Sequence, residues 1–460
     1  MLNNNTRALS RVASIILGLA LGFATPLVCG AQSEANTGTQ QQTSPAATTA
    51  ASQEASSSAS QNGATTVAAS LPPQEAAAAS TSASSSVSDP SAAPAAVTPA
   101  PAPQPLPTPA MTEPLQTAAP PHTFGAGPFG TLAITGILSG LGMTQDNRIA
   151  GDKSSNWDIS NGQVFVQKTT GWWQFYLQGG PYNLPDLGVP FLSTNKTLPD
   201  FFGPLPVGYL KLVKGTFSVE VGELPTLIGA EYTFSFENLN VERGLLWNQE
   251  NAVNRGIQLN ESYKKLSLSL SWNDGFYSNR YTWITGSAAY AFNAANTLSF
   301  VAGGNAGATR YTTIATPIQN NSSIYNIIYT YSKGNCYIQP YWQYTDVPTN
   351  LRAGITKGAT TDAGALLFNY NFKHGMSLAL RPEYITSSGS LASGAANLLY
   401  GPGSNAFAFT VTPTYQKSAF FIRADLSVVD ARSFIPGDAF GPQGQSGTQT
   451  RGAFETGFLF

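Results

Sequence analysis

The segment Leu266-Ser-Leu-Ser-Leu-Ser-Trp272 alternates apolar residues with serines. Successive side chains of a β-strand point to opposite faces, so this segment predicts a strand with one apolar face and one polar face. The same period of two recurs from Phe124 to Phe460 in segments of about ten residues. Sixteen segments of this kind are predicted, with spans of 131–142, 158–168, 171–180, 206–213, 216–222, 255–263, 265–273, 281–292, 297–305, 323–332, 335–345, 361–372, 376–386, 405–416, 418–429 and 450–460.

The connections between these predicted strands alternate in length along the chain. Seven are short turns, such as Lys264-Lys265 and Lys333-Gly334, and eight are long loops. Outer-membrane barrels place short turns in the periplasm and long loops outside, whereas a soluble sandwich has no reason to sort its connections in this way. We therefore predict an all-β protein, a transmembrane antiparallel up-and-down β-barrel of about 16 strands.

Composition and aromatic residues point the same way. Only 10% of the residues are charged, against about a quarter in soluble globular proteins. The mean hydropathy is nevertheless near zero, which suits strands whose two faces average out better than it suits membrane helices with apolar runs of about 20 residues. Trp172, Tyr263 and Phe292 lie near short turns, and Trp157 and Trp272 lie toward long loops, as two interfacial girdles would.

The two ends of the chain indicate export and insertion. Arg7 and Arg11 precede an apolar run and the small residues Cys29-Gly30-Ala31, which together predict a signal peptide over 1–31. Lipidation of Cys29 is the alternative. The segment 32–123 is rich in Ala, Ser, Pro, Thr and Gln, so we expect a disordered periplasmic linker. The barrel domain is predicted over 124–460, and its last strand ends at Phe460, which resembles the C-terminal signal that the barrel-assembly machinery recognises.

The longest gap between predicted strands, 223–254, is unusually acidic. We expect it to be an outer loop that folds inward and narrows a water-filled pore, although an ordinary surface loop is the alternative. Charged residues near a constriction would orient solutes and bias ion selectivity. The predicted constriction residues are Glu231, Glu237, Glu242, Arg243, Glu250 and Arg255.

Charged residues within the predicted strands should face the lumen, because an Arg or Lys on the lipid side costs about 2–4 kcal/mol at mid-membrane. Three arginines fall on the last strands of the ring, opposite the acidic loop. The glutamates of the loop would then face an arginine cluster across the channel, unless these charges simply pair locally. The predicted lumen-facing charges are Glu220, Arg381, Glu383, Arg423, Asp425, Arg451 and Glu455.

Residues 124–460 resemble the OmpL-like β-barrel porins of Gram-negative bacteria. The resemblance centres on Gly222-Glu-Leu-Pro-Thr-Leu-Ile-Gly-Ala-Glu231, on Asn240-Val-Glu-Arg-Gly-Leu-Leu-Trp247 and on Asn254-Arg-Gly-Ile-Gln258. It implies an outer-membrane location and passive diffusion of small hydrophilic solutes or ions. It identifies neither the solute nor the preferred sign of ion.

Other functional classes find less support. His122 lies in the linker and His374 in a short turn, and neither has a nearby Ser/Asp constellation, so we expect no enzyme. Two Cys and two His leave little room for a Cys/His metal site, and no cofactor is expected. A net charge of −2 argues against a nucleic-acid partner.

An outer-membrane adhesin or receptor that uses its long loops, without an open pore, is the alternative function. It would show loop-dependent binding without conductance. The expected partners of the porin are outer-membrane lipid, the barrel-assembly machinery and small solutes or ions. A homotrimer is a further expectation, because porins of this size often form trimers, but the sequence offers no interface for one.

Overall fold

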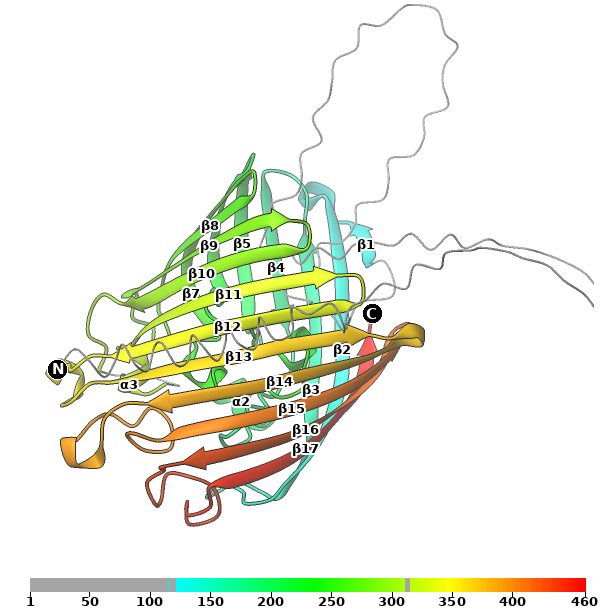
Figure 1. Ribbon diagram of the computed structural model, residues 1–460. Coiled ribbons are helices and arrows are strands. Elements are labelled where there is room, and N and C mark those ends of the chain that lie inside the picture. Colours follow the sequence, from blue (N-terminus) through cyan, green and yellow to red (C-terminus); the bar gives the residue numbers. More distant parts are fainter. Residues whose placement is uncertain (1–114, 116–120, 311–314) are drawn as a thin grey trace, which may run out of the picture.

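The computed structural model describes Leu115, residues 121–310 and residues 315–460. The predicted signal peptide and nearly all of the predicted linker lie outside these residues. The described chain forms one antiparallel sheet that curls into a barrel (Figure 1). From β2 to β17 each strand pairs with the next in chain order, and β17 pairs with β2, which closes the ring.

The strands are joined by turns and loops, and the loops contain a few short helices. The strands are β1 (His122–Gly125), β2 (Thr131–Gln145), β3 (Ser155–Lys168), β4 (Trp173–Gly179), β5 (Val207–Lys214), β6 (Phe217–Pro225), β7 (Val253–Tyr263), β8 (Leu266–Asn273), β9 (Trp283–Asn293), β10 (Asn296–Asn305), β11 (Ser323–Lys333), β12 (Cys336–Val347), β13 (Ala359–Asn371), β14 (Met376–Ser387), β15 (Asn405–Lys417), β16 (Phe420–Arg432) and β17 (Thr448–Leu459). The helices are η1 (Gly127–Phe129), α2 (Thr194–Asp200), η2 (Ser235–Glu237), η3 (Trp247–Gln249), α3 (Pro317–Asn320), η4 (Leu351–Ala353), η5 (Lys373–Gly375) and η6 (Leu391–Ser393).

The prediction of a sixteen-strand antiparallel barrel is confirmed, because each predicted span overlaps one strand from β2 to β17. Several strands run further toward the long loops than predicted. For example, β3 begins at Ser155 rather than at 158, and β16 ends at Arg432 rather than at 429. Ladder hydrogen bonds continue there although the apolar alternation has ended, so the sequence pattern stops before the strand does.

The short strand β1 was not predicted. It pairs antiparallel with the start of β2, with His122 opposite Ile134 and Gly125 opposite Thr131. The pairing of β17 with β2 begins only at Ile137, so β1 extends the sheet beyond the end of β17. A four-residue strand is too short to show an alternating pattern, and this one lies at the boundary of the predicted linker.

The two faces of the strands differ as the alternation requires. In β8 the side chains of Leu268, Leu270 and Trp272 are exposed on the outside of the barrel, whereas Ser269 and Ser271 are buried on the inside. Apolar residues on the outer face suit contact with lipid. No helix within the described ranges is long and apolar enough to cross a membrane.

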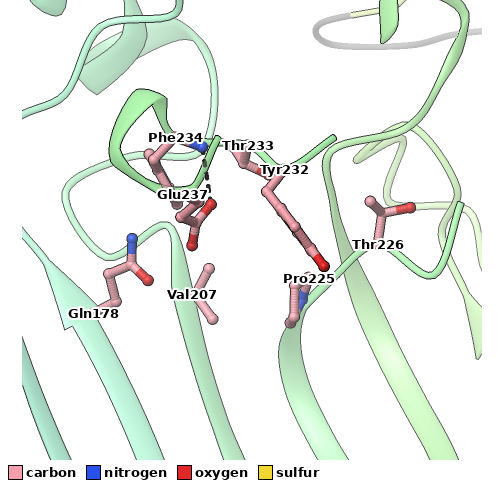
Figure 2. Close-up of a pocket in the computed structure, with 8 residues that line it drawn as sticks. All are labelled: Gln178, Val207, Pro225, Thr226, Tyr232, Thr233, Phe234 and Glu237. Carbon is pink, nitrogen blue, oxygen red and sulfur yellow. Dashed lines mark hydrogen bonds between the residues drawn. The ribbon is translucent and has the colours of Figure 1, made fainter. Parts of the chain in front are cut away.

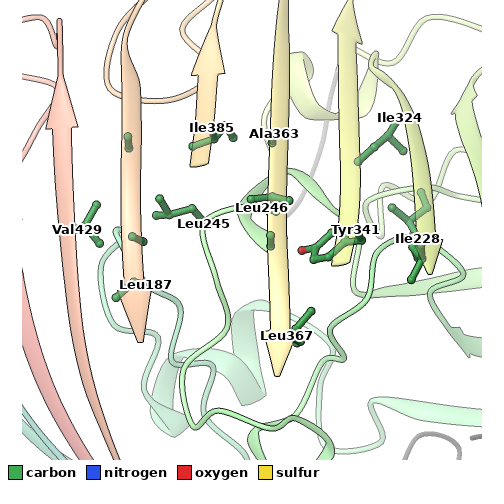
Figure 3. Close-up of a cluster of buried hydrophobic side chains, with 14 of the residues drawn as sticks. Leu187, Ile228, Leu245, Leu246, Ile324, Tyr341, Ala363, Leu367, Ile385 and Val429 are labelled. Atoms are coloured by element: carbon green, nitrogen blue, oxygen red, sulfur yellow. The ribbon is translucent and has the colours of Figure 1, made fainter. Parts of the chain in front are cut away.

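The interior of the barrel is packed with protein. Figure 3 shows Leu245 and Leu246, which follow β6 in the chain, beside Ile385 of β14, Ala363 of β13 and Tyr341 of β12 in one buried apolar cluster. Burying a leucine side chain contributes about 1.5–3 kcal/mol. The connection between β6 and β7 is therefore held inside the ring by apolar contacts as well as by polar ones.

A second apolar cluster occupies another part of the interior. It joins the inward-facing residues Ile137, Phe165 and Phe421 to Phe236 of the β6–β7 connection. Leu115 belongs to this cluster and is 0% exposed. Leu115 of the predicted linker therefore packs against the barrel, and His122 and Thr123 of the same predicted linker pair with β2.

The outward face generates a stability prediction. Replacing Leu270 with Arg should lower the free energy of unfolding in lipid vesicles by about 2–4 kcal/mol, because a guanidinium would lie in the hydrocarbon near mid-membrane. Leu270→Met is the control and should change little. Urea unfolding followed by tryptophan fluorescence measures both variants. An unchanged free energy in Leu270→Arg would show that this face does not contact lipid.

Candidate functional site

The connection between β6 and β7, residues 226–252, is called the crossing segment here. Its two ends are tied together, because the Thr226 amide donates to the Ala252 carbonyl at 3.0 Å. The Thr226 hydroxyl also donates to the Asn251 side chain at 2.7 Å. The segment therefore leaves the sheet and returns to it at one point. Gly229 has a φ of +84°, and its amide approaches Asn326 of β11 at 3.2 Å.

Three buried arginines of the opposite wall form ion pairs in the interior. Arg381 of β14 pairs with Glu231 of the crossing segment at 2.6 Å, and Arg451 of β17 pairs with Glu242 of the same segment at 3.0 Å. Arg423 of β16 instead pairs with its neighbour Glu455 at 2.6 Å. Charge-assisted contacts of this kind are about twice as strong as neutral hydrogen bonds. Two of the three pairs therefore join the crossing segment to the wall.

The same wall also holds the backbone of the crossing segment. Arg423 donates to the carbonyls of Asn238 at 2.9 Å and Ser235 at 2.6 Å. In the reverse direction, the amide of Glu242 donates to the Asp425 carboxylate at 2.8 Å. These contacts satisfy backbone groups of a segment that is irregular apart from an isolated parallel bridge between Arg243 and Asp186, as buried backbone groups require.

The six predicted constriction residues divide into five environments. Glu231 and Glu242 meet arginines of the wall, as described above. Arg243 pairs with Asp186, which lies between β4 and β5, at 2.5 Å. Glu250 is buried, and neither of its carboxylate oxygens has a hydrogen-bond partner in the described part of the chain.

Arg255 is separate from the others. It lies within β7, pairs with Asp274 at 3.1 Å, and places its guanidinium 3.7 Å from the centre of the Tyr277 ring. It therefore belongs to the edge of its own hairpin rather than to the crossing segment. The observed segment, 226–252, is also shorter at both ends than the predicted loop, 223–254, because the ladder of β6 and β7 continues to Pro225 and Val253.

Glu237 lines a small cavity beside the wall. The cavity has a volume of about 10 Å³ and is bordered by Gln178, Val207 and Tyr232, among others (Figure 2). The Glu237 carboxylate accepts a hydrogen bond from the Phe234 amide at 3.0 Å. Burial raises the pKa of the Glu237 carboxyl group above its usual range, because desolvation disfavours the ionised form.

The charges predicted to line the lumen all lie on buried rows of their strands, but protein covers them instead of open space. Each is 2% exposed or less. Glu220 pairs with Lys211 of the adjacent strand at 2.9 Å, and Arg381 also contacts Glu383 at 3.1 Å. The sequence analysis predicts that these charged side chains face a water-filled lumen. The crossing segment takes that place because its acids and carbonyls are suitable partners for the arginines.

Several residues of the site escaped the sequence analysis. Asp186 holds Arg243, Asn240 donates to Thr412 of β15 at 2.6 Å, and Asp274 holds Arg255. Tyr341 of β12 is 1% exposed, and its hydroxyl has no hydrogen-bond partner among the described residues. Asp186 lies in an irregular connection with no motif, so its partner follows only from the three-dimensional arrangement. The inward position of Tyr341 was visible in the alternation of β12.

Among the residues that the structure describes, no set of three or more His, Cys, Asp and Glu side chains is arranged to hold a metal ion. His122 lies on β1 and His374 in η5, and both are exposed.

Comparisons with known proteins place the chain among outer-membrane barrels. A family model described as "Putative beta-barrel porin-2, OmpL-like" matches residues 131–460. No curated protein is significantly similar in sequence.

Similar solved structures include three outer-membrane proteins. OmpT of Vibrio cholerae has 12% identity and a TM-score of 0.48, with 72% of this chain and 98% of that chain covered. OmpF of Salmonella typhi, in complex with daunomycin, has 12% identity and a TM-score of 0.46, with 72% and 98% covered. The outer-membrane channel DcaP of Acinetobacter baumannii has 10% identity and a TM-score of 0.47, with 72% and 97% covered. At these scores we infer nothing about solutes from the similarities.

The buried ion pairs generate a second stability prediction. Arg423→Gln should lower the free energy of unfolding by about 3–5 kcal/mol, because it leaves the Glu455 carboxylate buried and unpaired. The matched control is Arg432→Gln. Arg432 is 74% exposed in its pair with Asp430, so its loss should change stability little. Equal effects of the two substitutions in urea unfolding would contradict the assignment of Arg423 to a buried, paired site.

Proposed function

We propose that this chain, which belongs to the OmpL-like β-barrel porin family, is an outer-membrane porin. Small hydrophilic solutes or ions would diffuse through it down their gradients. The observation that carries this proposal is the closed ring of β2 to β17, with apolar residues outside and polar or charged residues on most inward rows. A sixteen-stranded ring is wide enough for an aqueous channel, whereas a ring of about eight strands is filled by its own side chains.

In this proposal the crossing segment is the constriction. Its contacts with β14, β15, β16 and β17 support the role, because a segment fixed to the opposite wall narrows whatever passage remains beside it. Charged groups in such a passage discriminate by the size and sign of the solute. Passive transport needs no catalytic group, so the proposed role is not enzymatic.

The orientation follows from the loops. We infer that the short turns face the periplasm and the long loops the exterior, as in other outer-membrane barrels. The strand β1 pairs with the first residues of β2, which lie at the same end of the barrel as the short turns. The linker that precedes β1 is therefore assigned to the periplasm in this proposal.

Planar lipid bilayers test the function directly. Purified full-length protein should insert and produce discrete conductance steps in KCl, because the barrel would provide a continuous aqueous path. Absence of steps from folded, heat-modifiable protein would contradict the porin proposal. Binding that depends on the long loops, without conductance, would favour the adhesin or receptor instead.

The constriction gives a separate prediction. Deleting residues 230–250 should raise the single-channel conductance, because the segment that fills the interior is removed. The remaining residues 226–229 and 251–252 are sufficient to join β6 to β7, since Pro225 and Val253 are paired neighbours.

The control for this deletion is removal of residues 391–394, an exposed part of the connection between β14 and β15. That deletion should leave the conductance unchanged. A conductance that stays at the wild-type value without residues 230–250 would show that the crossing segment does not limit flow.

A further inference from the structure

Glu250 is the buried acid that the fold leaves without a protein partner. It is 6% exposed, and both carboxylate oxygens lack a hydrogen-bond partner among the described residues. Its position is closely defined, because a Cβ atom added to Gly229 would lie only 1.8 Å from one of these oxygens. An ionised carboxylate in such a place is costly unless a positive group or hydrogen-bond donors accompany it.

The surroundings of Glu250 are acidic. Glu231 and Glu383 both contact the single guanidinium of Arg381, at 2.6 and 3.1 Å. These are the two carboxylates whose charges act most strongly on Glu250. Arg381 thus serves two carboxylates, and Glu250 adds a third negative charge when all three are ionised. In a medium of low dielectric constant this excess of negative charge attracts cations much more strongly than it would in water.

A second, independent feature marks the same place. The hydroxyl of Tyr341 is buried without a hydrogen-bond partner among the described residues. Tyr341 lies opposite Ala365 of β13, and Ala365 lies opposite Glu383 of β14, so the tyrosine and this carboxylate lie at the same level of the barrel wall. Figure 3 shows its hydroxyl end directed toward the side of Leu246. A phenolic oxygen has lone pairs that can contact a cation.

The neighbouring polar groups hold the frame of this place. Gln343 donates to the Leu246 carbonyl at 3.0 Å and accepts from Asn326 at 2.9 Å. Asn326 in turn accepts from the Gly229 amide at 3.2 Å. The crossing segment is therefore fixed to β11 and β12 at Gly229 and at Leu246, near Glu250.

We propose that Glu250, with Tyr341 and the carboxylates of Glu231 and Glu383, forms a binding site for a small monovalent cation along the permeation path, and that this site makes the porin cation-selective. The inference rests on the proposed function, since selectivity requires conductance. Oxygen ligands suit alkali cations, and ions pass such a site when binding is strong enough to admit them and weak enough to release them.

Reversal potentials in a KCl gradient test the site. The wild type should prefer K⁺ over Cl⁻. At alkaline pH, where Glu250 is ionised, Glu250→Gln should lower the ratio of cation to anion permeability several-fold, because it removes one negative charge without removing a protein hydrogen bond. Tyr341→Phe should lower the same ratio by a smaller factor. Glu261→Gln is the matched control, because Glu261 lies on the outward row of β7 and accepts a hydrogen bond from Thr216. The permeability ratio of this variant should equal that of the wild type.

The outcomes separate the two proposals. Conductance with an anion-preferring wild type, or with the same reversal potential in the wild type and Glu250→Gln, would overturn the cation site and leave the porin function intact. Absence of conductance from the folded wild type would overturn both. A several-fold loss confined to Glu250→Gln and Tyr341→Phe would support the site.

The pH dependence provides a second readout of the same site. Burial, with Glu231 and Glu383 nearby, raises the pKa of Glu250 well above the usual 4.5. Glu250 is therefore ionised only at higher pH and takes up a proton as the pH falls through its raised pKa. The cation preference of the wild type should decline over that range, whereas the preference of Glu250→Gln should decline less. Parallel pH profiles of the two proteins would contradict a role for Glu250.

Discussion

The ion pair between Arg381 and Glu231, 2.6 Å long, is the contact on which the arrangement of the interior depends. A buried guanidinium without a partner would destabilise the barrel by several kcal/mol, so Arg381 and its counterparts on β16 and β17 require acids and carbonyls close by. The crossing segment supplies most of them. Its charged and backbone groups therefore determine which wall it meets, and the apolar contacts of Leu245 and Leu246 add affinity at that position.

The two sides of the crossing segment differ in how completely their charges are matched. Toward β16 and β17, Arg423 and Arg451 each contact both a carboxylate and backbone carbonyls. Toward β11 and β12, Glu250 and Tyr341 retain acceptor oxygens without a hydrogen-bond partner among the described residues. The first side holds the segment in place, and the second is where a permeant cation would find ligands. Structural support and selectivity are thus assigned to different groups of the same segment.

The sequence predicted the ring well because its physical cause is local. The alternation in Leu266–Trp272 reflects a strand with lipid on one face and protein on the other, and each further strand repeats that constraint independently. The interior was less predictable. The spacing of Arg381, Arg423 and Arg451 showed which row they occupy. The partners of two of them were not predictable, because Glu231 and Glu242 lie more than a hundred residues away in the chain from Arg381 and Arg451. Asp186 and the packing of Leu115 had no local signal at all. The position of Arg255 within β7 was also not visible, because the end of the β6–β7 pairing is set by hydrogen bonds rather than by charge.

The central claim is that the crossing segment lies against the far wall of the ring, and a cross-link in intact outer membranes tests it most directly. Cysteines would be introduced by Asn240→Cys and Thr412→Cys, whose native side chains are 2.6 Å apart, in a Cys336→Ser background. A short bifunctional thiol reagent should join this pair. It should not join Asn240→Cys to Ser271→Cys, which lies on the inward row of β8. Failure of the first pair to cross-link, or equal cross-linking of both pairs, would contradict the account.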